Sequence, residues 1–466
     1  MGIMSVVTIP LKTRIYEEDI INKRMELCRK VYNNMLHDRL KALRKMEHDK
    51  DYIESLKVIH SAYKTEDKKV QKEIKKSQAY KDAQEMQKNK LREYGFSEFD
   101  FKSQVLLYTK PFTTNITATV ASYTIAAPMW AAFNKYLFSN GQAIHFKKYD
   151  SQNSITSDGK AGLKIVLANK KSTRHPESPF GLSVMYGSNR GGKVICMPLM
   201  VDKNDLYMQE MICHDIKIVR LIRRKIHGKY RYYIQLTVDC PPAIKFDRQT
   251  GEIKNPINDG NVGIFIDTRK ITICSKDGIK QIDLINQKQL EMEETIARIN
   301  RYLDTSRRIS NPENFNPDGT IKKGTIVEGR RTKLNWTNSK NYLKARDKKA
   351  DIQRRLAEQR KIRAGEITNV ILSHGNNIIC NKYNFKAAQM RRKESEVNEN
   401  GQNTSKKKAG KAISFSAPAT LLTMLDNKLI ARGYNPINKV EVDKEMKITD
   451  KSRIEMAQTL YLQLEN

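Results

Sequence analysis

Two stretches of the sequence decide the fold: residues 261–275, NVGIFIDTRKITICS, and residues 376–392, NNIICNKYNFKAAQMRR. Each holds a short apolar run rich in β-branched residues, a pattern typical of a buried strand. Asn-Asp-Gly precedes the first run, Lys-Asp-Gly follows it and His-Gly-Asn-Asn leads into the second, so turn-forming residues bound both. We therefore predict strands at residues 262–273 and 377–381.

The charge balance of the chain indicates a polyanionic partner. Its 466 residues carry a net charge of +33, which no fold requires and which favours nucleic acid over an anionic membrane surface. A hydrophobic content of 39% can support real cores, and the length fits roughly two to four domains. No apolar run reaches the roughly 20 residues of a membrane span, and the N-terminus lacks the pattern of a signal peptide.

The cysteines are scattered singly along the chain. None belongs to a Cys-x-x-Cys pair, so a four-cysteine zinc site is not expected. Single cysteines on apolar runs are usually small buried hydrophobes in a reducing cytosol. The six positions are 28, 196, 213, 240, 274 and 380.

The first half of the chain changes from β to helical patterns and back. Residues 5–11 predict a strand, and residues 15–94 predict charged helices because apolar residues recur near helical spacing. After Thr65 the periodicity weakens, and this lysine-rich segment is either a solvated helix face or a basic arm that contacts nucleic-acid backbone. Residues 116–141 predict one helix kinked near Pro128, with Trp130 packed in a core.

Residues 145–247 predict β structure. The string IRRKIHGKYRYYIQLTV predicts a hairpin joined at His227-Gly228-Lys229. A small barrel that is basic and rich in aromatic residues suits contact with RNA or with a duplex backbone. We expect the N-terminal strand to join this barrel, so that the helices between them form an insertion.

Beyond residue 275 the pattern predicts a mixed sheet. The predicted elements are strands at 279–284 and 438–442 and helices at 286–303, 339–372, 417–432 and 450–464. Turn residues crowd positions 306–335, and residues 391–411 are polar, so both segments are predicted loops. This order of elements fits a sheet of the RNase H type.

The layout resembles the TnpB transposon-encoded RNA-guided nucleases and their relatives, the compact type V CRISPR effectors. The resemblance covers nearly the whole chain, and several unusual strings appear in the right order. It implies an α+β multidomain fold with a wedge barrel (residues 1–13 and 145–257), an inserted helical recognition domain (14–144) and an RNase H-like RuvC domain (258–466). The strings are WAAFNKYLFSNGQAIHFKKYDS, YRYYIQLTVDCPP, VGIFIDTRKITICS, DTSRRISNPENFNPDGTIKKG, NYLKARDKK, NKYNFKAAQMRRK and FSAPATLLTMLDNKLIARG.

The residues that carry the family's chemistry are replaced in this chain. In such nucleases carboxylates hold Mg²⁺ ions that activate water. The resemblance places the first catalytic Asp at Phe265 and the catalytic Glu at Asn381, while the family's zinc knuckle and third acid have no counterpart before Asn466. Asp267 shares a strand face with position 265 but lies about 6.6–6.8 Å further along, too far to replace the acid. No catalytic magnesium and no zinc are expected, and residual nuclease activity is not expected.

The resemblance includes nuclease-dead relatives, the TldR proteins, that act as RNA-guided transcriptional repressors. It implies a guide RNA and double-stranded target DNA as partners, no membrane, a monomer or dimer on the RNA, and a bacterial cytoplasm with association to the nucleoid. Four alternatives stay open: a nuclease-dead CRISPR-type effector that recruits another factor, a divergent active RNA-guided DNA endonuclease, a decayed transposon protein and a generic RNA-binding protein.

Two groups of residues are candidates for nucleic-acid contact. Polar side chains before and within the helix at 116–141 suit contact with base edges of a short target-adjacent motif. Basic side chains at the hairpin turn and on the long helix suit contact with the RNA or DNA backbone. The first group is Thr113, Asn115, Thr117 and Tyr123, and the second is Arg223, Arg224, Lys225, Arg354 and Arg355.

Overall fold

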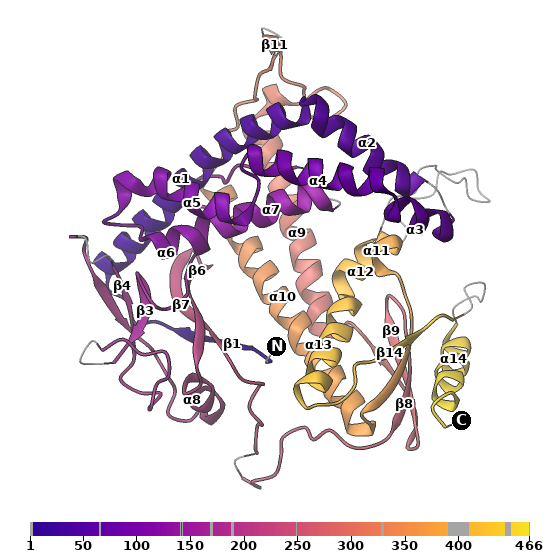
Figure 1. The fold of residues 1–466 in the computed structure, drawn as a ribbon. Helices are drawn as coiled ribbons and strands as arrows, with labels where there is room; N and C mark the ends of the chain where they lie inside the picture. Colours follow the sequence, from indigo (N-terminus) through magenta and orange to yellow (C-terminus); the bar gives the residue numbers. More distant parts are fainter. Residues whose placement is uncertain are drawn as a thin grey trace. The chain divides into compact units, whose positions relative to one another are not determined.

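The computed structural model describes residues 3–465 apart from 65–66, 140, 142, 168–170, 188–190, 248, 328–329, 390–409 and 443–448. The chain forms two compact units, one of Met1–Arg224 with Tyr230–Ala243 and the other of Lys225–Lys229 with Ile244–Asn466. Helices and several separate sheets make up the chain (Figure 1), so its fold class is α+β, as predicted. The predicted loop at 391–411 lies almost entirely outside the described residues.

The described strands of the first unit form two sheets. One has the order β1-β7-β6-β2, with β1 (Ser5–Pro10), β7 (Lys229–Val238), β6 (Ile216–Ile226) and β2 (Ser154–Ser157). The other joins β3 (Leu163–Val166), β4 (Ser183–Tyr186) and β5 (Ile195–Pro198). The N-terminal strand pairs antiparallel with β7, from Ser5 opposite Val238 to Pro10 opposite Tyr233, so it does join the later β structure.

The turn of the predicted hairpin lies at His227 and Gly228. Both residues have positive φ, 48° and 78°, which is the conformation of a tight type I′ turn. Glycine adopts this conformation freely, and the right-handed twist of the two strands favours it. The sequence therefore located this turn correctly.

Helices fill the chain between β1 and β2. In α1 a stripe of side chains including Ile21, Met25, Cys28 and Met35 is completely buried, as the helical spacing predicted. The helix α5 was not predicted, although Ser97 and Asp100 form a capping box at its start. The helices of this unit are α1 (Ile15–Glu47), α2 (Lys50–Lys64), α3 (Lys68–Lys76), α4 (Gln78–Glu93), α5 (Glu98–Thr109), η1 (Lys110–Phe112), α6 (Ala118–Ala121), η2 (Ser122–Ala126), α7 (Ala127–Phe138) and α8 (Leu206–Ile212).

The predicted kinked helix at 116–141 contains a π-helical turn instead of a simple kink. Between α6 and α7 the segment η2 has π geometry, and the amide of Ala127 donates to the carbonyl of Ser122, five residues earlier. Pro128 has no amide hydrogen and cannot bond the carbonyl of Thr124, so the turn before it widens. Trp130 packs against Phe101 in the core of this unit, as predicted.

The second unit is built on a five-stranded sheet with the order β10-β9-β8-β13-β14. The strands β8 (Asn261–Ile266), β9 (Lys270–Ser275) and β10 (Gly278–Asp283) are antiparallel, while β13 (Asn377–Asn381) runs parallel to β8 and to β14 (Asn438–Val440). The predicted single strand at 262–273 is therefore wrong. It is two strands that pair with each other, because the polar residues Asp267, Thr268 and Arg269 form a turn between them.

The two faces of this sheet are covered by different helices. On one face the apolar residues of β8, β9 and β13 form a core with α10 and α13. On the other face α14 packs on β8 and β9. The remaining elements of the unit are α9 (Gln287–Ser310), η3 (Pro312–Asn314), β11 (Ile326–Val327), β12 (Arg330–Arg331), α10 (Lys340–His374), α11 (Phe385–Gln389), α12 (Gly410–Ser416), α13 (Pro418–Ala431) and α14 (Asp450–Leu462).

The cysteines form no disulfide, and Cys28, Cys240, Cys274 and Cys380 are buried, as expected of small apolar side chains. Burial raises the pKa of both Cys28 and Cys380 to about 12, so these thiols stay protonated and unreactive at neutral pH. Among the described helices, none has a stretch long and apolar enough to span a bilayer.

Candidate functional site

The sheet face where the sequence leads us to look for acids lies under α14. In β8 the side chains of residues 262, 264 and 266 point into the core with α10 and α13, so residues 261, 263 and 265 point to the opposite face. Phe265, where the resemblance implies a catalytic Asp, is only 5% exposed. It belongs to a small apolar core with Cys274 of β9 and with Met456, Ala457 and Tyr461 of α14.

Gly263 lets the backbone of α14 rest directly on β8. A Cβ atom at this position would lie 2.4 Å from the amide nitrogen of Tyr461 and 2.5 Å from the carbonyl oxygen of Ala457. Both atoms belong to helix backbone, so neither could move aside unless α14 shifted. Figure 1 shows α14 on the opposite side of β8 and β9 from α13. The helix therefore closes this face of β8.

Asn381 is held by the backbone of the neighbouring strand. Its side-chain oxygen accepts a hydrogen bond from the amide of Ile266 at 2.7 Å, and its side-chain nitrogen donates to the carbonyl of Ile266 at 3.0 Å. The side chain is buried, and it extends the β8–β13 ladder by one more pair of bonds. A carboxylate here could accept the first bond but could not donate the second. The amide therefore serves strand pairing.

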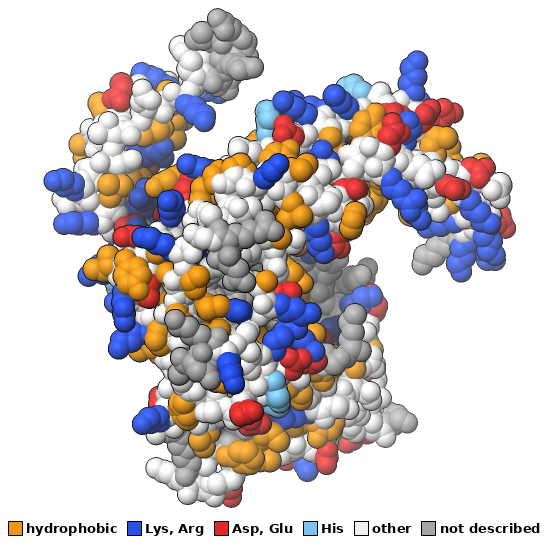
Figure 2. All heavy atoms as spheres, turned by 60° about the vertical axis from the view of Figure 1, so that its left-hand side comes forward, with side chains coloured by type: hydrophobic (Ala, Val, Ile, Leu, Met, Phe, Trp, Pro, Cys, Tyr) orange, Lys and Arg blue, Asp and Glu red, His pale blue; other side chains and the backbone are white. Residues whose placement is uncertain are grey.

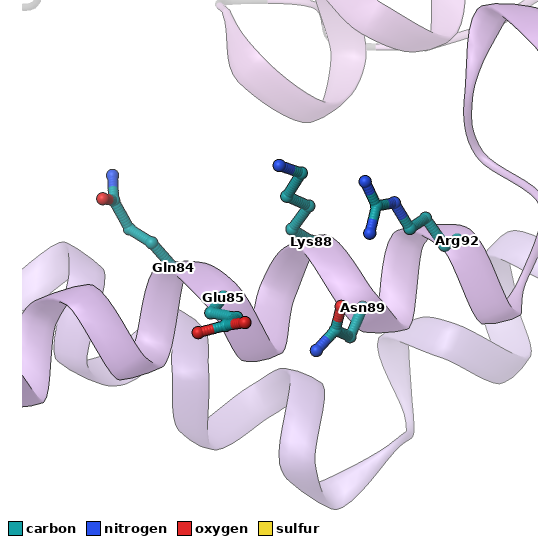
Figure 3. A pocket seen from close by; sticks show the side chains of 5 residues that line it. All are labelled: Gln84, Glu85, Lys88, Asn89 and Arg92. Carbon is teal, nitrogen blue, oxygen red and sulfur yellow. The ribbon is translucent and has the colours of Figure 1, made fainter.

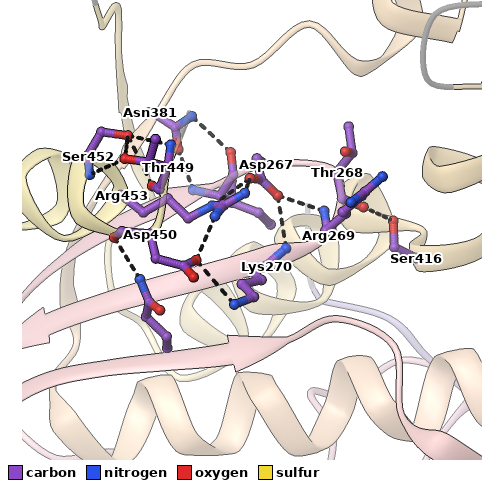
Figure 4. A network of polar contacts seen from close by, with 12 residues as sticks. Asp267, Thr268, Arg269, Lys270, Asn381, Ser416, Thr449, Asp450, Ser452 and Arg453 are labelled. Carbon is purple, nitrogen blue, oxygen red and sulfur yellow. Dashed lines mark hydrogen bonds and ion pairs between the residues drawn. The ribbon is translucent and has the colours of Figure 1, made fainter. Parts of the chain in front are cut away.

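Asp267 forms the turn between β8 and β9 and is neutralised by α14. One carboxylate oxygen accepts from the amides of Arg269 at 2.6 Å and Lys270 at 2.9 Å. The other accepts from Arg453, whose Nε lies at 2.8 Å and whose terminal nitrogen lies at 2.6 Å. Asp450 bridges Arg453 to the Lys270 side chain (Figure 4), so the turn and the helix start form one network. The sequence did not point to Arg453.

These residues do not fit a magnesium site. Mg²⁺ needs several oxygen ligands in near-octahedral geometry, usually including carboxylates. Phe265 offers no ligand, the oxygen of Asn381 is bonded to a backbone amide, and Asp267 already receives four donors, two of them from a guanidinium. Within the described parts of the chain, no group of three His, Cys, Asp or Glu side chains could hold a metal ion.

Arg223, one of the residues predicted to contact a nucleic-acid backbone, is buried within the first unit. Its side chain is only 4% exposed. It donates to the side-chain oxygens of Asn153 at 3.0 Å and Asn22 at 2.8 Å, and it pairs with Asp150 at 2.5 Å. The guanidinium also lies 4.3 Å from the centre of the Tyr230 ring. Arg223 therefore joins α1, β6 and the segment before β2, and each of its three side-chain nitrogens already donates to a protein oxygen.

The other two residues of the hairpin group are partly engaged. The guanidinium of Arg224 lies 5.1 Å from the centre of the Tyr233 ring, on the neighbouring strand. Lys225 belongs to the second unit, where its Nζ lies 3.1 Å from Asp347 of α10. Both side chains keep some exposure, so they stay candidates for nucleic-acid contact.

On α10 the candidates pair along their own helix. Arg354 bonds Asp351 at 2.9 Å and Glu358 at 3.0 Å, while Arg355 lies 3.5 Å from Asp351. Burial raises the pKa of Asp351, but the bond from Arg354 and the nearby cations outweigh this and leave the pKa below its usual value. The charge of Arg354 is thus offset locally, and Arg355, with 49% of its side chain exposed, is the freer of the two.

The four residues proposed to read a target-adjacent motif lie on one short segment at the start of α6 and η2. Thr117 is the N-cap of α6 and accepts from the amide of Val120 at 3.4 Å. The side chain of Asn115 donates to its neighbour Thr114, and Thr113 is half-buried. Tyr123 is 39% exposed on the π-helical turn. Capping accounts for Thr117, while the exposed Tyr123 has no such structural role.

A shallow groove of about 320 Å³ lies along α4, within the lysine-rich segment whose role the sequence left open. Gln84, Lys88 and Arg92 follow one another at four-residue spacing, with Glu85 and Asn89 beside them (Figure 3). All five side chains are exposed. Lys and Arg side chains also lie over much of the face shown in Figure 2, with Asp and Glu among them.

Comparisons with known proteins give no family. No family model matches the chain, and no curated protein matches it. Among solved structures it is similar to a Cas12f1–sgRNA–target DNA complex, with 12% identity over 98% of this chain and 94% of that chain and a TM-score of 0.41. A CRISPR-Cas12f ternary complex matches with 11% identity over 94% and 89% and a TM-score of 0.26. A Cas12i1 R-loop complex before target DNA cleavage matches with 10% identity and a TM-score of 0.25, over 92% of this chain and 56% of that chain.

Proposed function

We propose that this protein is a guide-RNA-directed DNA-binding protein that holds its target without cutting it. The net charge of +33 supports a nucleic-acid partner, and the resemblance of several sequence strings to TnpB-like proteins supports an RNA guide. In such systems base pairing with the guide reads the sequence, while the protein reads a short adjacent motif and the shape of the backbone. Guide RNA and double-stranded DNA are the proposed partners.

The observation that carries the absence of cutting is the closed face of β8. Phe265 lies in an apolar core under α14, Asn381 is bonded to strand backbone, and Asp267 is paired with Arg453. A site of this kind has neither the carboxylates nor the access that two-metal cleavage of a phosphodiester requires. A divergent nuclease that relied on Asp267 would first have to break its ion pair with Arg453.

A complex that binds its target and does not cut remains on its site. Exchange of a DNA duplex for an RNA–DNA hybrid is nearly balanced in free energy. Cationic contacts from the protein can therefore shift this equilibrium toward the hybrid. Over a promoter, such a complex would exclude RNA polymerase. We therefore propose transcriptional repression as its biological effect, with Tyr123 the best placed of the motif-reading candidates.

The test uses the protein together with the RNA that copurifies with it. That RNA is sequenced, a supercoiled plasmid carrying the matched target is incubated with the complex and Mg²⁺, and both footprint and product are measured. We expect a protected target and no nicked or linear plasmid. Mismatches in the roughly 8–12 nucleotides next to the motif should abolish the footprint. Linear product would overturn the proposal, as would a footprint that ignores the mismatches.

Repression is tested separately with a reporter gene whose promoter carries the matched target. We expect the complex to lower reporter output, and an identical promoter with mismatches next to the motif to escape it. If binding occurs without repression, a pull-down from cells will show whether the protein recruits another factor, which is the alternative effect of a complex that does not cut.

A further inference from the structure

We infer that the end of the α9–α10 helix pair, residues 298–349, holds RNA through a stacked Trp336–Arg307 pair and exposed lysines of the same region. We call this region the α9–α10 lobe. This inference rests on the proposed function, which supplies the RNA partner. It adds where on the protein an unpaired segment of that RNA is bound. None of the residues selected from the sequence for nucleic-acid contact lies in this lobe.

The charge of the lobe is strongly positive. Residues 298–349 contain 14 Lys and Arg but only five Asp and Glu. Asp304 already pairs with Arg308 at 2.9 Å, and Asp347 pairs with Lys225 at 3.1 Å. In contrast with Arg354 on α10, Lys322, Lys323 and Lys333 are exposed and form no ion pair within the described part of the chain. A polyanion would meet lysines whose charge no described acidic group offsets.

The same region holds an aromatic platform. The guanidinium of Arg307 is 3.6 Å from the centre of the Trp336 ring, and Phe315 meets the same ring edge-on with centres 5.7 Å apart. The guanidinium of Arg308 lies 4.9 Å from the centre of the Phe315 ring. Trp336 and Phe315 are both half-exposed. Unpaired RNA bases stack on such aromatic rings and guanidinium planes, and duplex DNA does not offer its base faces in this way.

Two buried asparagines fix the platform in place. Asn311 is fully buried, accepts from the amide of Thr337 at 2.5 Å and donates to the carbonyl of Thr337 at 2.9 Å. Asn314 donates to the carbonyl of Asn335 at 2.5 Å. The residues on both sides of Trp336 are therefore bonded to the segment after α9. A ring held in this way loses little conformational freedom when a base stacks on it.

The experiment removes bound nucleic acid from the purified protein and then measures its affinity for the RNA that copurified with it. Trp336→Ala should weaken binding about 5- to 100-fold, since loss of stacking on one base has that effect, while Trp336→Phe should stay within about threefold. Trp130 is the second of the two tryptophans, so in a Trp130→Phe background Trp336 is the only one. Its fluorescence should then be quenched when RNA binds, which a merely structural role would not produce.

The lysines are tested through the salt dependence of the same affinity. Replacing Lys322, Lys323 and Lys333 by Gln should lower the slope of log Kd against log salt by about two, because each lost phosphate contact in a single strand accounts for about 0.7. The matched control replaces Lys276, Lys280 and Lys288 by Gln, since these lysines are also exposed in the second unit. That triple variant should keep the wild-type slope.

The outcomes separate the inference from the proposed function. If the wild type binds its RNA while Trp336→Ala and the lobe triple variant behave like the control, the lobe does not hold RNA and only this inference fails. Preferential binding of an acidic protein by the lobe, with RNA affinity unchanged, would also overturn it. If the wild type binds no RNA at all, the proposed function fails with it.

Discussion

At residue 381 an amide and a carboxylate of similar size have opposite effects. The amide of Asn381 both donates to and accepts from the backbone of Ile266, which satisfies two groups of a buried strand. A carboxylate would place negative charge beside the carbonyl oxygen of Ile266 and would lose the bond that the amide donates to it. Asn381 thus stabilises the parallel pairing of β8 and β13.

Asn381→Asp should lower the free energy of unfolding by about 2–4 kcal/mol at pH 7, because an unpaired charge is buried. Burial raises the pKa of the new carboxyl, so its protonated form regains a donor as the pH falls and the deficit relative to wild type shrinks in acid. Urea unfolding at several pH values measures this. Asn384→Asp is the matched control, since that exposed side chain accepts from the amide of Ala387 and donates no bond to any described residue. An equal loss in both variants would contradict the argument.

Lys147 gives the first unit a pH dependence. Its ammonium lies 3.9 Å from the centre of the Tyr32 ring and 2.8 Å from the side-chain oxygen of Gln152, without a described acid in ion-pair distance. Burial lowers the pKa of Lys147 to about 8 from 10.5. The charged side chain therefore destabilises the folded state relative to the unfolded chain. The unfolded chain binds more protons between pH 8 and 10.5, and stability rises with pH over that window.

Lys147→Met should therefore raise the free energy of unfolding at pH 7 by about 1–3 kcal/mol. The advantage should shrink between pH 8 and 10.5 and disappear above it, because the wild-type lysine is then neutral in both states. Thermal or urea unfolding across this range tests the sign. Lys148→Met, at an exposed neighbour, should show no such dependence. A constant difference at every pH would rule the explanation out.

At the scale of elements, α14 determines what the sheet can do. It contributes the apolar lid over Phe265, the guanidinium that neutralises Asp267, and the backbone that rests on Gly263. Its first turn is fixed by the capping box of Thr449 and Ser452, which directs Arg453 toward the β8–β9 turn. The helix is as much a part of the site as either strand.

Gly263→Ala should lower the free energy of unfolding by about 1–3 kcal/mol, because the new methyl group meets the backbone of α14 at 2.4 and 2.5 Å. The helix must then move away from β8. Urea unfolding measures the loss, and hydrogen exchange should show weaker protection in α14. Gly365→Ala inside α10 is the control, because its nearest neighbour lies at 3.7 Å and helix propensity favours alanine there by about 0.5–1 kcal/mol. If Gly263→Ala and Gly365→Ala were equally stable, the close contact between α14 and β8 at Gly263 would be refuted.

The sequence located most elements but not the contacts between distant ones. The β8–β9 turn could have been found, because a 12-residue strand exceeds the usual length and Asp-Thr-Arg interrupts its apolar run. The burial of Arg223 could also have been found, since it alternates in step with buried Leu221 on β6. The pairing of Arg453 with Asp267 joins residues 186 positions apart, and nothing in the local pattern specifies it.

For the whole molecule, positive charge is the dominant property. The net charge of +33 is what remains after every Asp and Glu is counted, so ion pairs within the chain, such as those of Asp351, cannot reduce it. Counterions released from a nucleic acid then contribute much of the binding free energy, and that contribution falls as salt rises. Affinity should therefore be governed by ionic strength more than by any one residue.

Raising salt from 50 to 200 mM should weaken RNA binding by at least about a hundredfold, as expected for six or more phosphate contacts to a single strand. Filter binding or fluorescence anisotropy with the copurified RNA measures the slope. Adding a neutral solute at constant ionic strength controls for changes in solvent and should leave Kd nearly unchanged. A slope near zero would show that the cations do not face the nucleic acid.

The way α14 rests on β8 has an evolutionary consequence. Metal chemistry on this face of the sheet would need at least acids at positions 265 and 381 and a helix moved off the strand, which are changes in separate parts of the chain. Each change alone buries a charge or opens the apolar lid, so every single-step intermediate is less stable than its parent. Selection would remove such intermediates before the set was complete. The close contact at Gly263 therefore opposes the stepwise appearance of a metal site on this face of the sheet.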